Sequence, residues 1–150
     1  MMLRKPRQLV VALGLGLFAA IAHAQATPAG LWKTIDDETK KEKSLIRVTE
    51  SGGVFTGKLE KLLDPTAKPD AVCDKCSDER KDKPLVGMTL IKGVKQNESN
   101  KDRWDGGEIL DPNNGKTYKV RLTPVDDGKK LEVRGFIGPF YRNQTWTRVE

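Results

Sequence analysis

The residues with the clearest capacity for chemistry are Cys73 and Cys76, which are separated by two residues. Thiols at this spacing can close a small disulfide ring, exchange electrons with a partner, or hold copper(I) together with a methionine such as Met88. Zinc needs about four ligands, and beyond residue 24 the sequence has two cysteines and no histidine. We therefore predict a structural disulfide and no metal or other cofactor. The redox and copper roles remain alternatives.

Three carboxylates, Asp105, Glu108 and Asp111, lie close together in the sequence. Paired carboxylates can do acid–base work when burial raises the pKa of one of them. In a regular strand, however, residues 105 and 108 face opposite sides, unless Gly106 and Gly107 introduce a bulge. The serines beyond residue 24 have no histidine to activate them. The sequence therefore predicts no catalytic residues, and we expect a protein that is not an enzyme.

The first 24 residues have the three parts of a secretory signal peptide. A basic start is followed by the apolar run Leu9–Ala22 and by the small-residue site Ala22-His23-Ala24. The apolar run is 14 residues long, whereas a membrane-spanning helix needs about 20. We predict cleavage between Ala24 and Gln25 and export to the periplasm or beyond, in what we expect to be a Gram-negative bacterium. No transmembrane segment is expected in residues 25–150.

The charge of the remaining residues argues against a nucleic-acid partner. The formal net charge of the whole sequence is +6, and removing the three basic residues of the signal peptide lowers it to +3. Basic and acidic residues alternate in runs such as Asp78–Lys83, which are typical of solvated surfaces. The basic stripe that phosphate binding requires is missing.

Period-two alternation of apolar and polar residues dominates residues 25–150 and predicts strands with one buried face. Short turn segments, such as Ser51-Gly52-Gly53 and Asp126-Asp127-Gly128, separate them and favour antiparallel pairing. The eight predicted strands cover Leu31–Ile35, Leu45–Thr49, Val54–Leu59, Leu85–Val94, Arg103–Leu110, Thr117–Leu122, Leu131–Arg134 and Gln144–Val149.

These strands predict a single all-β domain over residues 25–150. Closure into an antiparallel up-and-down barrel, with the strand at Trp32 pairing with the strand at Trp146, hides every sheet edge. A sandwich is the alternative. The long segment Asp64–Pro84 contains three prolines and both cysteines. We expect it to lie over one end of the barrel, as a disulfide-pinned loop, as a short helix or as a binding lid. The tryptophans, including Trp104, are expected in the core or in the lining of a pocket.

Five segments resemble the exported bacterial DUF2147 proteins, to which no function is assigned: Gly30-Leu31-Trp32, Leu62–Pro65, Asp70–Cys76, Trp104–Lys116 and Leu131–Phe136. This resemblance covers Gly30–Glu150 and implies an exported β-rich domain, without catalytic residues to transfer. Gly30-Leu31-Trp32 is also similar to the G-x-W of lipocalins and other calycin barrels, in which the tryptophan plugs the closed end. That resemblance implies a lipocalin-like barrel.

Taken together, the sequence favours a non-enzymatic protein of the cell envelope that binds a small apolar or amphipathic ligand. An eight-stranded barrel can hold one such ligand, or its interior can be filled by side chains. A filled barrel would instead indicate a structural or protein-interaction module, and a thiol-redox or copper-handling protein is the third possibility. The ligand-binding residues and any protein partner are not identified by the sequence.

Overall fold

Strands make up the regular structure of residues 25–150, the part of the chain that the computed structural model describes. The predicted signal peptide, Met1–Ala24, lies outside the described residues. Within residues 25–150 no helix is long and apolar enough to span a bilayer. The strands are β1 (Gly30–Ile35), β2 (Glu42–Ser51), β3 (Val54–Leu62), β4 (Thr89–Gln96), β5 (Trp104–Asp111), β6 (Lys116–Val125), β7 (Lys130–Ile137) and β8 (Phe140–Arg148).

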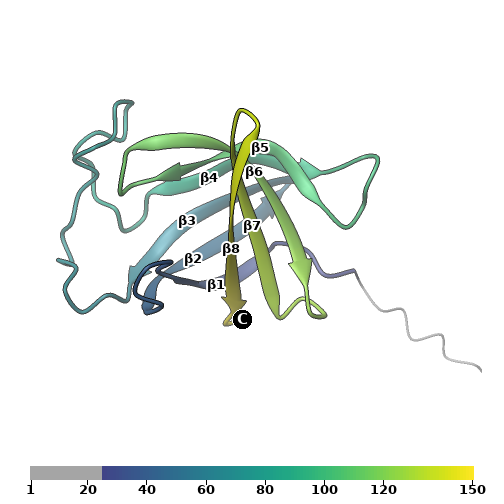
Figure 1. Ribbon diagram of the computed structural model, residues 1–150, viewed down its shortest axis with the longest axis horizontal. Coiled ribbons are helices and arrows are strands. Elements are labelled where there is room, and N and C mark those ends of the chain that lie inside the picture. The colour runs from purple at the N-terminus through teal and green to yellow at the C-terminus, as the bar shows by residue number, and fades with distance from the viewer. Residues whose placement is uncertain (1–24) are drawn as a thin grey trace, which may run out of the picture.

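The strands follow one another around a closed antiparallel barrel, as predicted (Figure 1). Each strand pairs with its neighbours in the sequence, and β8 returns to β1. This closing contact is short, because only Trp32 pairs with Arg148 and Lys33 with Thr147. By comparison, β7 and β8 pair over their whole length, from Lys130 opposite Thr147 to Ile137 opposite Phe140.

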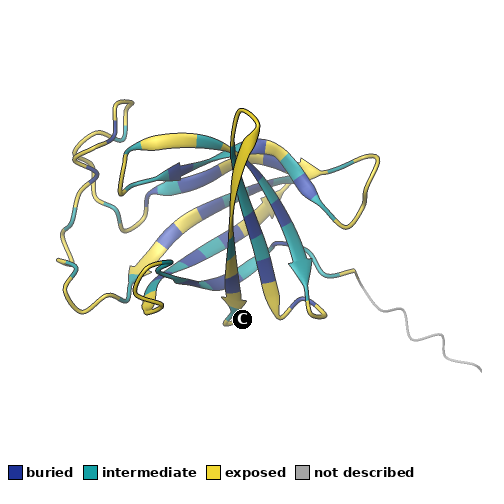
Figure 2. Ribbon diagram, in the orientation of Figure 1, coloured by how far each residue is buried: buried dark blue, intermediate teal, exposed yellow. Residues whose placement is uncertain are grey.

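The polar–apolar alternation places one face of each strand inside the barrel. Along β2, the buried residues Ser44, Ile46 and Val48 alternate with more exposed neighbours, and Ile46 lies opposite Trp32 of β1. Figure 2 shows a similar alternation of buried and more exposed residues along β3 and β7. β4 and β8 depart from it, since Leu90 and Ile91 of β4 are both buried and the first four residues of β8 are exposed. The half-buried strands predicted from the period of two are therefore confirmed.

Three tryptophans fill one end of the barrel, which we call the closed end. Trp32, Trp104 and Trp146 are each no more than 2% exposed. The ring of Phe55 meets that of Trp104 edge to face, with centroids 6.2 Å apart, a favourable geometry for aromatic pairs. The tryptophans thus belong to the core, and the start of β1 and the end of β8 meet at this end.

The side chain of Arg148 covers the closed end. Its guanidinium donates hydrogen bonds to the carbonyl oxygens of Gly128 at 2.5 Å, Ala29 at 2.8 Å and Thr27 at 3.0 Å. Its central carbon lies 4.2 Å from the centre of the Trp32 ring, a cation–π contact. Burial lowers the pKa of Arg148. Arg148 therefore ties the segment before β1 and the β6–β7 turn to the last strand.

Several predicted strands are shorter than the observed ones, and two begin four residues away from their observed starts. The fourth strand begins at Thr89, not Leu85, because Gly87 has a φ of +89° and turns the chain into the strand. The last strand begins at Phe140, not Gln144. The sequence analysis missed the turn at Gly138-Pro139, which makes β7 and β8 a hairpin longer than expected.

We predict that Arg148→Met destabilises the fold, because it leaves three backbone carbonyl oxygens without donors. The three oxygens are only partly buried, so each should cost less than the about 1–3 kcal/mol of a fully buried unpaired group, and we expect a total loss of about 2–4 kcal/mol. Urea denaturation followed by tryptophan fluorescence measures it. Arg47→Met is the matched control, since Arg47 makes only exposed ion pairs with Glu60 and Glu150. Equal losses for both variants would contradict the role given to Arg148.

Candidate functional site

The connection between β3 and β4, residues 63–88, carries the predicted disulfide, and we call it the cystine loop. Cys73 and Cys76 are bonded and both are buried. The loop is also closed by backbone hydrogen bonds: Cys73 N–H donates to the Lys83 oxygen at 2.9 Å, and Asp82 N–H donates to the Cys73 oxygen at 2.8 Å. The segment is thus a pinned loop, the first of the three expectations, and the described structure has no helix between β3 and β4.

The disulfide packs into an extension of the core outside the barrel. Cys73 and Cys76 belong to one buried cluster with Met88, Leu90 and Leu110. Leu90 precedes Ile91, and both are buried, so β4 is covered on its two faces. Burial of both sulfurs keeps a partner thiol from approaching them, which supports a structural role for the bond.

The cystine loop also abuts the turn between β5 and β6. A Cβ atom built on Gly115 would lie 1.8 Å from the carbonyl oxygen of Lys75, and Gly115 has a φ of +70°. Both the backbone conformation and the closeness of the loop therefore require glycine at this position. The disulfide segment is held against the barrel at this point.

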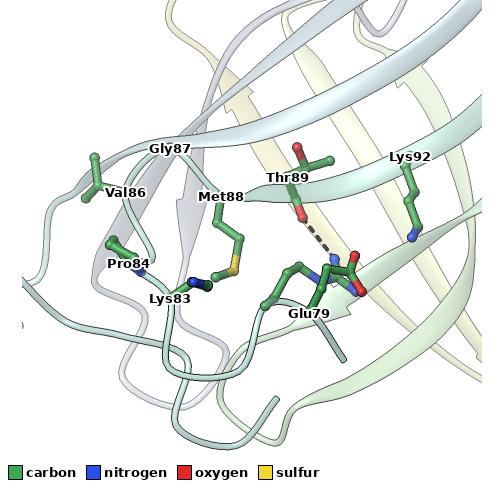
Figure 3. Close-up of a pocket in the computed structure, with 9 residues that line it drawn as sticks. Glu79, Lys83, Pro84, Val86, Gly87, Met88, Thr89 and Lys92 are labelled. Atoms are coloured by element: carbon green, nitrogen blue, oxygen red, sulfur yellow. Dashed lines mark hydrogen bonds between the residues drawn. The ribbon is translucent and has the colours of Figure 1, made fainter. Parts of the chain in front are cut away.

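A groove of about 410 Å³ lies between the cystine loop and the start of β4 (Figure 3). One wall is apolar and consists of Pro84, Val86 and Met88. In Figure 3 the Met88 side chain extends from the start of β4 toward Lys83. The remaining lining residues are Glu79, Arg80, Lys83, Gly87, Thr89 and Lys92.

Arg80 is held in place as part of the groove wall. Its Nη1 donates to the Thr89 carbonyl oxygen at 2.9 Å, and its Nη2 donates to Oδ2 of Asp78 at 2.6 Å. Hydrogen bonds from the Arg80 side chain and backbone lower the pKa of Asp78 to about 2. Asp78 therefore stays ionised at neutral pH, and the positive charge of Arg80 is already compensated.

Two lysines leave positive charge available at the groove. Among the described residues, no carboxylate oxygen lies within ion-pairing distance of the Lys83 ammonium. Lys92 lies 3.5 Å from Glu108, but both side chains are about half exposed, and such pairs contribute little. An anion in the groove would meet Lys83 and Lys92.

The end of the barrel opposite the tryptophans is lined by polar groups. The hydroxyls of Thr34 and Ser44 are 2.7 Å apart and buried. The carboxylate of Asp37, between β1 and β2, accepts hydrogen bonds from Arg142 and Gln144 of β8. Burial acts to raise the pKa of Asp37, but these hydrogen bonds lower it below its ordinary value. The polar contacts link the β1–β2 loop to β8 where the two strands no longer pair.

None of the three carboxylates considered for acid–base work is paired with another. Gly106 has a φ of +79°, and the register shifts between Trp104 and Gly107. This bulge turns Asp105 and Glu108 to the same outer face, where they lie opposite Lys95 and Lys92. Asp111 accepts a hydrogen bond from the Asn113 N–H at 2.9 Å and so shapes a turn. Within residues 25–150, no three His, Cys, Asp or Glu side chains are grouped as metal ligands.

The sequence analysis missed the residues of the groove. Arg80 and Lys83 lie in the mixed-charge run Asp78–Lys83, which is typical of a solvated surface, and Lys92 has the spacing of an ordinary outward strand residue. Val86 was assigned to a strand. The one signal that could have helped is Gly87, because an isolated glycine inside a strand pattern indicates an irregularity in the strand.

A closed antiparallel barrel of eight strands, plugged at one end by a tryptophan of the first strand, defines a lipocalin-like fold. Among solved structures, the chain is similar to HP1028 of Helicobacter pylori, a protein described as belonging to the lipocalin family. The two share 19% sequence identity, with a TM-score of 0.70 over 83% of this chain and 84% of the other.

The chain belongs to the DUF2147 family, described as uncharacterised proteins conserved in bacteria, whose model matches residues 30–148. Comparison with curated proteins gives no match. The family and the barrel thus agree with both resemblances seen in the sequence.

We predict that Gly115→Ala displaces the cystine loop, because the added methyl group would overlap the Lys75 carbonyl. Gly53→Ala is the matched control: Gly53 also has a positive φ, +82°, but nothing lies within 4 Å of its Cβ position. Backbone strain alone costs about 1–2 kcal/mol, so the control should lose about that much and keep its loop protected. Limited trypsin digestion at the lysines of the loop, timed for both variants, is the measurement. Equal cleavage rates would show that the loop does not depend on this contact.

Proposed function

We propose that residues 25–150 form a non-enzymatic binder of a small amphipathic anion, acting in the cell envelope after export. The observation that carries the proposal is the groove, in which the uncompensated Lys83 stands beside the apolar wall of Pro84, Val86 and Met88. A ligand with an acidic head and a short hydrocarbon chain meets both requirements at once.

The size and chemistry of the groove support this ligand class. Small-molecule sites usually enclose about 300–1,000 Å³, and the groove holds about 410 Å³. A hydrocarbon chain gains free energy by leaving water for the apolar wall, while Lys83 and Lys92 attract a carboxylate or phosphate head. A second hollow, near Asp105, is lined mainly by polar residues and lacks such a wall.

The proposed site lies outside the barrel, whereas the sequence analysis considered only the interior. Trp32, Trp104 and Trp146 occupy the closed end. The proposal therefore keeps the amphipathic ligand and moves it to the outer groove. Burial of Cys73 and Cys76 favours a structural disulfide over the redox or copper-handling alternative.

Export is part of this proposal and rests on the signal-peptide pattern of residues 1–24. We expect the full sequence, produced in a Gram-negative host, to yield a periplasmic protein that begins at Gln25. Its mass should be lower than that of the reduced chain by two hydrogens, because Cys73 and Cys76 are bonded. Native mass spectrometry without reductant should also show a bound small molecule. Bare oxidised protein would favour the structural module, and a reduced pair with a metal mass would favour copper handling. Uncleaved protein in the cytosol would contradict export.

The groove is tested by comparing Val86→Glu with Val149→Glu. Val86 lines the groove and is 43% exposed, whereas Val149 is 49% exposed and follows the last strand at the other end of the barrel. We expect decanoate, below its micelle concentration, to bind the wild type. Val86→Glu should weaken this binding roughly tenfold or more, because it adds a second carboxylate to the groove beside that of Glu79 and interrupts the apolar wall. Isothermal titration calorimetry measures both variants.

Two results would contradict the groove as the binding site. The first is equal decanoate affinity for Val86→Glu and Val149→Glu. The second is equal affinity of the wild type for decanoate and for decyltrimethylammonium, which has the same chain and a cationic head. The second result would show that Lys83 and Lys92 do not select the head group.

A further inference from the structure

The hairpin of β7 and β8 ends in a tip of exposed apolar side chains. Ile137, Phe140 and Tyr141 are 56%, 75% and 59% exposed, and they surround the turn Gly138-Pro139. Half of the six large hydrophobic side chains exposed in residues 25–150 therefore lie within five residues. Such concentration is uncommon on a protein surface and marks an interaction site.

The tip is a fixed projection from the barrel (Figure 1). Ile137 pairs with Phe140 and Phe136 pairs with Tyr141, so the hairpin is ordered up to its turn. β8 has left β1 by this point, because the two strands pair only at Trp32 and Lys33 of β1. Figure 2 shows the end of the hairpin exposed. The apolar side chains therefore extend away from the core.

Positive charge surrounds the tip. Residues 133–144 contain Arg134 and Arg142 and no acidic residue. The guanidinium of Arg134 lies 4.2 Å from the centre of the Tyr141 ring and also 3.5 Å from a carboxylate oxygen of Glu132. The side chain of Arg142 is 66% exposed although it pairs with Asp37. Lys119 of β6, also exposed, lies opposite Phe136. Apolar and aromatic residues flanked by cations match the boundary of a bilayer with acidic head groups.

We propose that the β7–β8 hairpin docks the protein on an anionic phospholipid surface by inserting Ile137, Phe140 and Tyr141. A bilayer accommodates a narrow, convex tip, whereas each side of a stable protein interface uses about 20–30 residues. The basic side chains around the hairpin would contact the lipid phosphates. This surface is separate from the groove, so the inference does not rest on the proposed ligand.

Sedimentation of residues 25–150 with vesicles tests the proposal. We expect binding to vesicles of phosphatidylcholine with 30% phosphatidylglycerol, and much weaker binding to phosphatidylcholine alone. Ile137→Ser with Phe140→Ser should lower the affinity about tenfold or more, because the inserted apolar groups are lost. The matched control is Val72→Ser with Val149→Ser, which removes two exposed valines elsewhere and should leave binding within about twofold of wild type.

A fluorescent reporter tests insertion directly. The three native tryptophans are buried, so an exposed tryptophan from Phe140→Trp adds a distinct red-shifted emission, which should move to the blue on anionic vesicles. Absence of wild-type binding, or equal binding by the serine variant and its control, would overturn the proposal. Light scattering that shows a wild-type dimer and a monomeric serine variant would also overturn the proposal, because it would assign the tip to a contact between two copies of the protein. Wild-type protein that binds vesicles but not decanoate would leave this inference standing while contradicting the groove.

Discussion

Closure of the barrel depends on one short seam, where Arg148 of β8 lies over Trp32 of β1. Every other pair of neighbouring strands is consecutive in the sequence, so its pairing follows from a turn or loop. The β1–β8 contact has no such connection. It consists of two residue pairs and of backbone hydrogen bonds between Leu31 and the two residues after β8, Val149 and Glu150. The Arg148 guanidinium strengthens this contact, because it donates hydrogen bonds to three carbonyl oxygens and lies over the indole ring of Trp32. The closed end and its tryptophan core are organised around this contact.

The shortness of the seam decides what the opposite end of the barrel can present. Beyond Lys33 and Thr147, β1 and β8 separate, and polar contacts from Asp37 to Arg142 and Gln144 link the two sides. The connections at this end are therefore free to differ in length and character. One is the long cystine loop, which builds a groove on the outer face, and another is the two-residue turn of the β7–β8 hairpin. Both proposed contact surfaces lie on the outside of the barrel, which serves as their support.

Most of the fold could be predicted from the sequence, and most of the groove could not. Alternation is a local property, so the strand around Ile46 and Val48 and the barrel that hides its edges follow from the pattern of residue types. The groove joins Val86, Lys83 and Lys92 across a loop whose path depends on the contact of Gly115 with Lys75. No residue spacing encodes that contact. The bulge at Gly106 could be predicted in part. The two consecutive glycines indicated that a bulge was possible, but only the register shift in the structure shows that Asp105 and Glu108 share a face.

The position of the seam also governs the order in which the chain can fold. Hairpins such as β7–β8 join residues that are near in sequence, and they can form as soon as both strands are present. The hydrogen bond from Arg148 to Ala29 spans 119 residues, and contacts of such high sequence separation form slowly. Until Arg148 is in place, the chain can form its hairpins but lacks the guanidinium that covers the Trp32 ring. We therefore expect closure of the barrel to follow the formation of its hairpins.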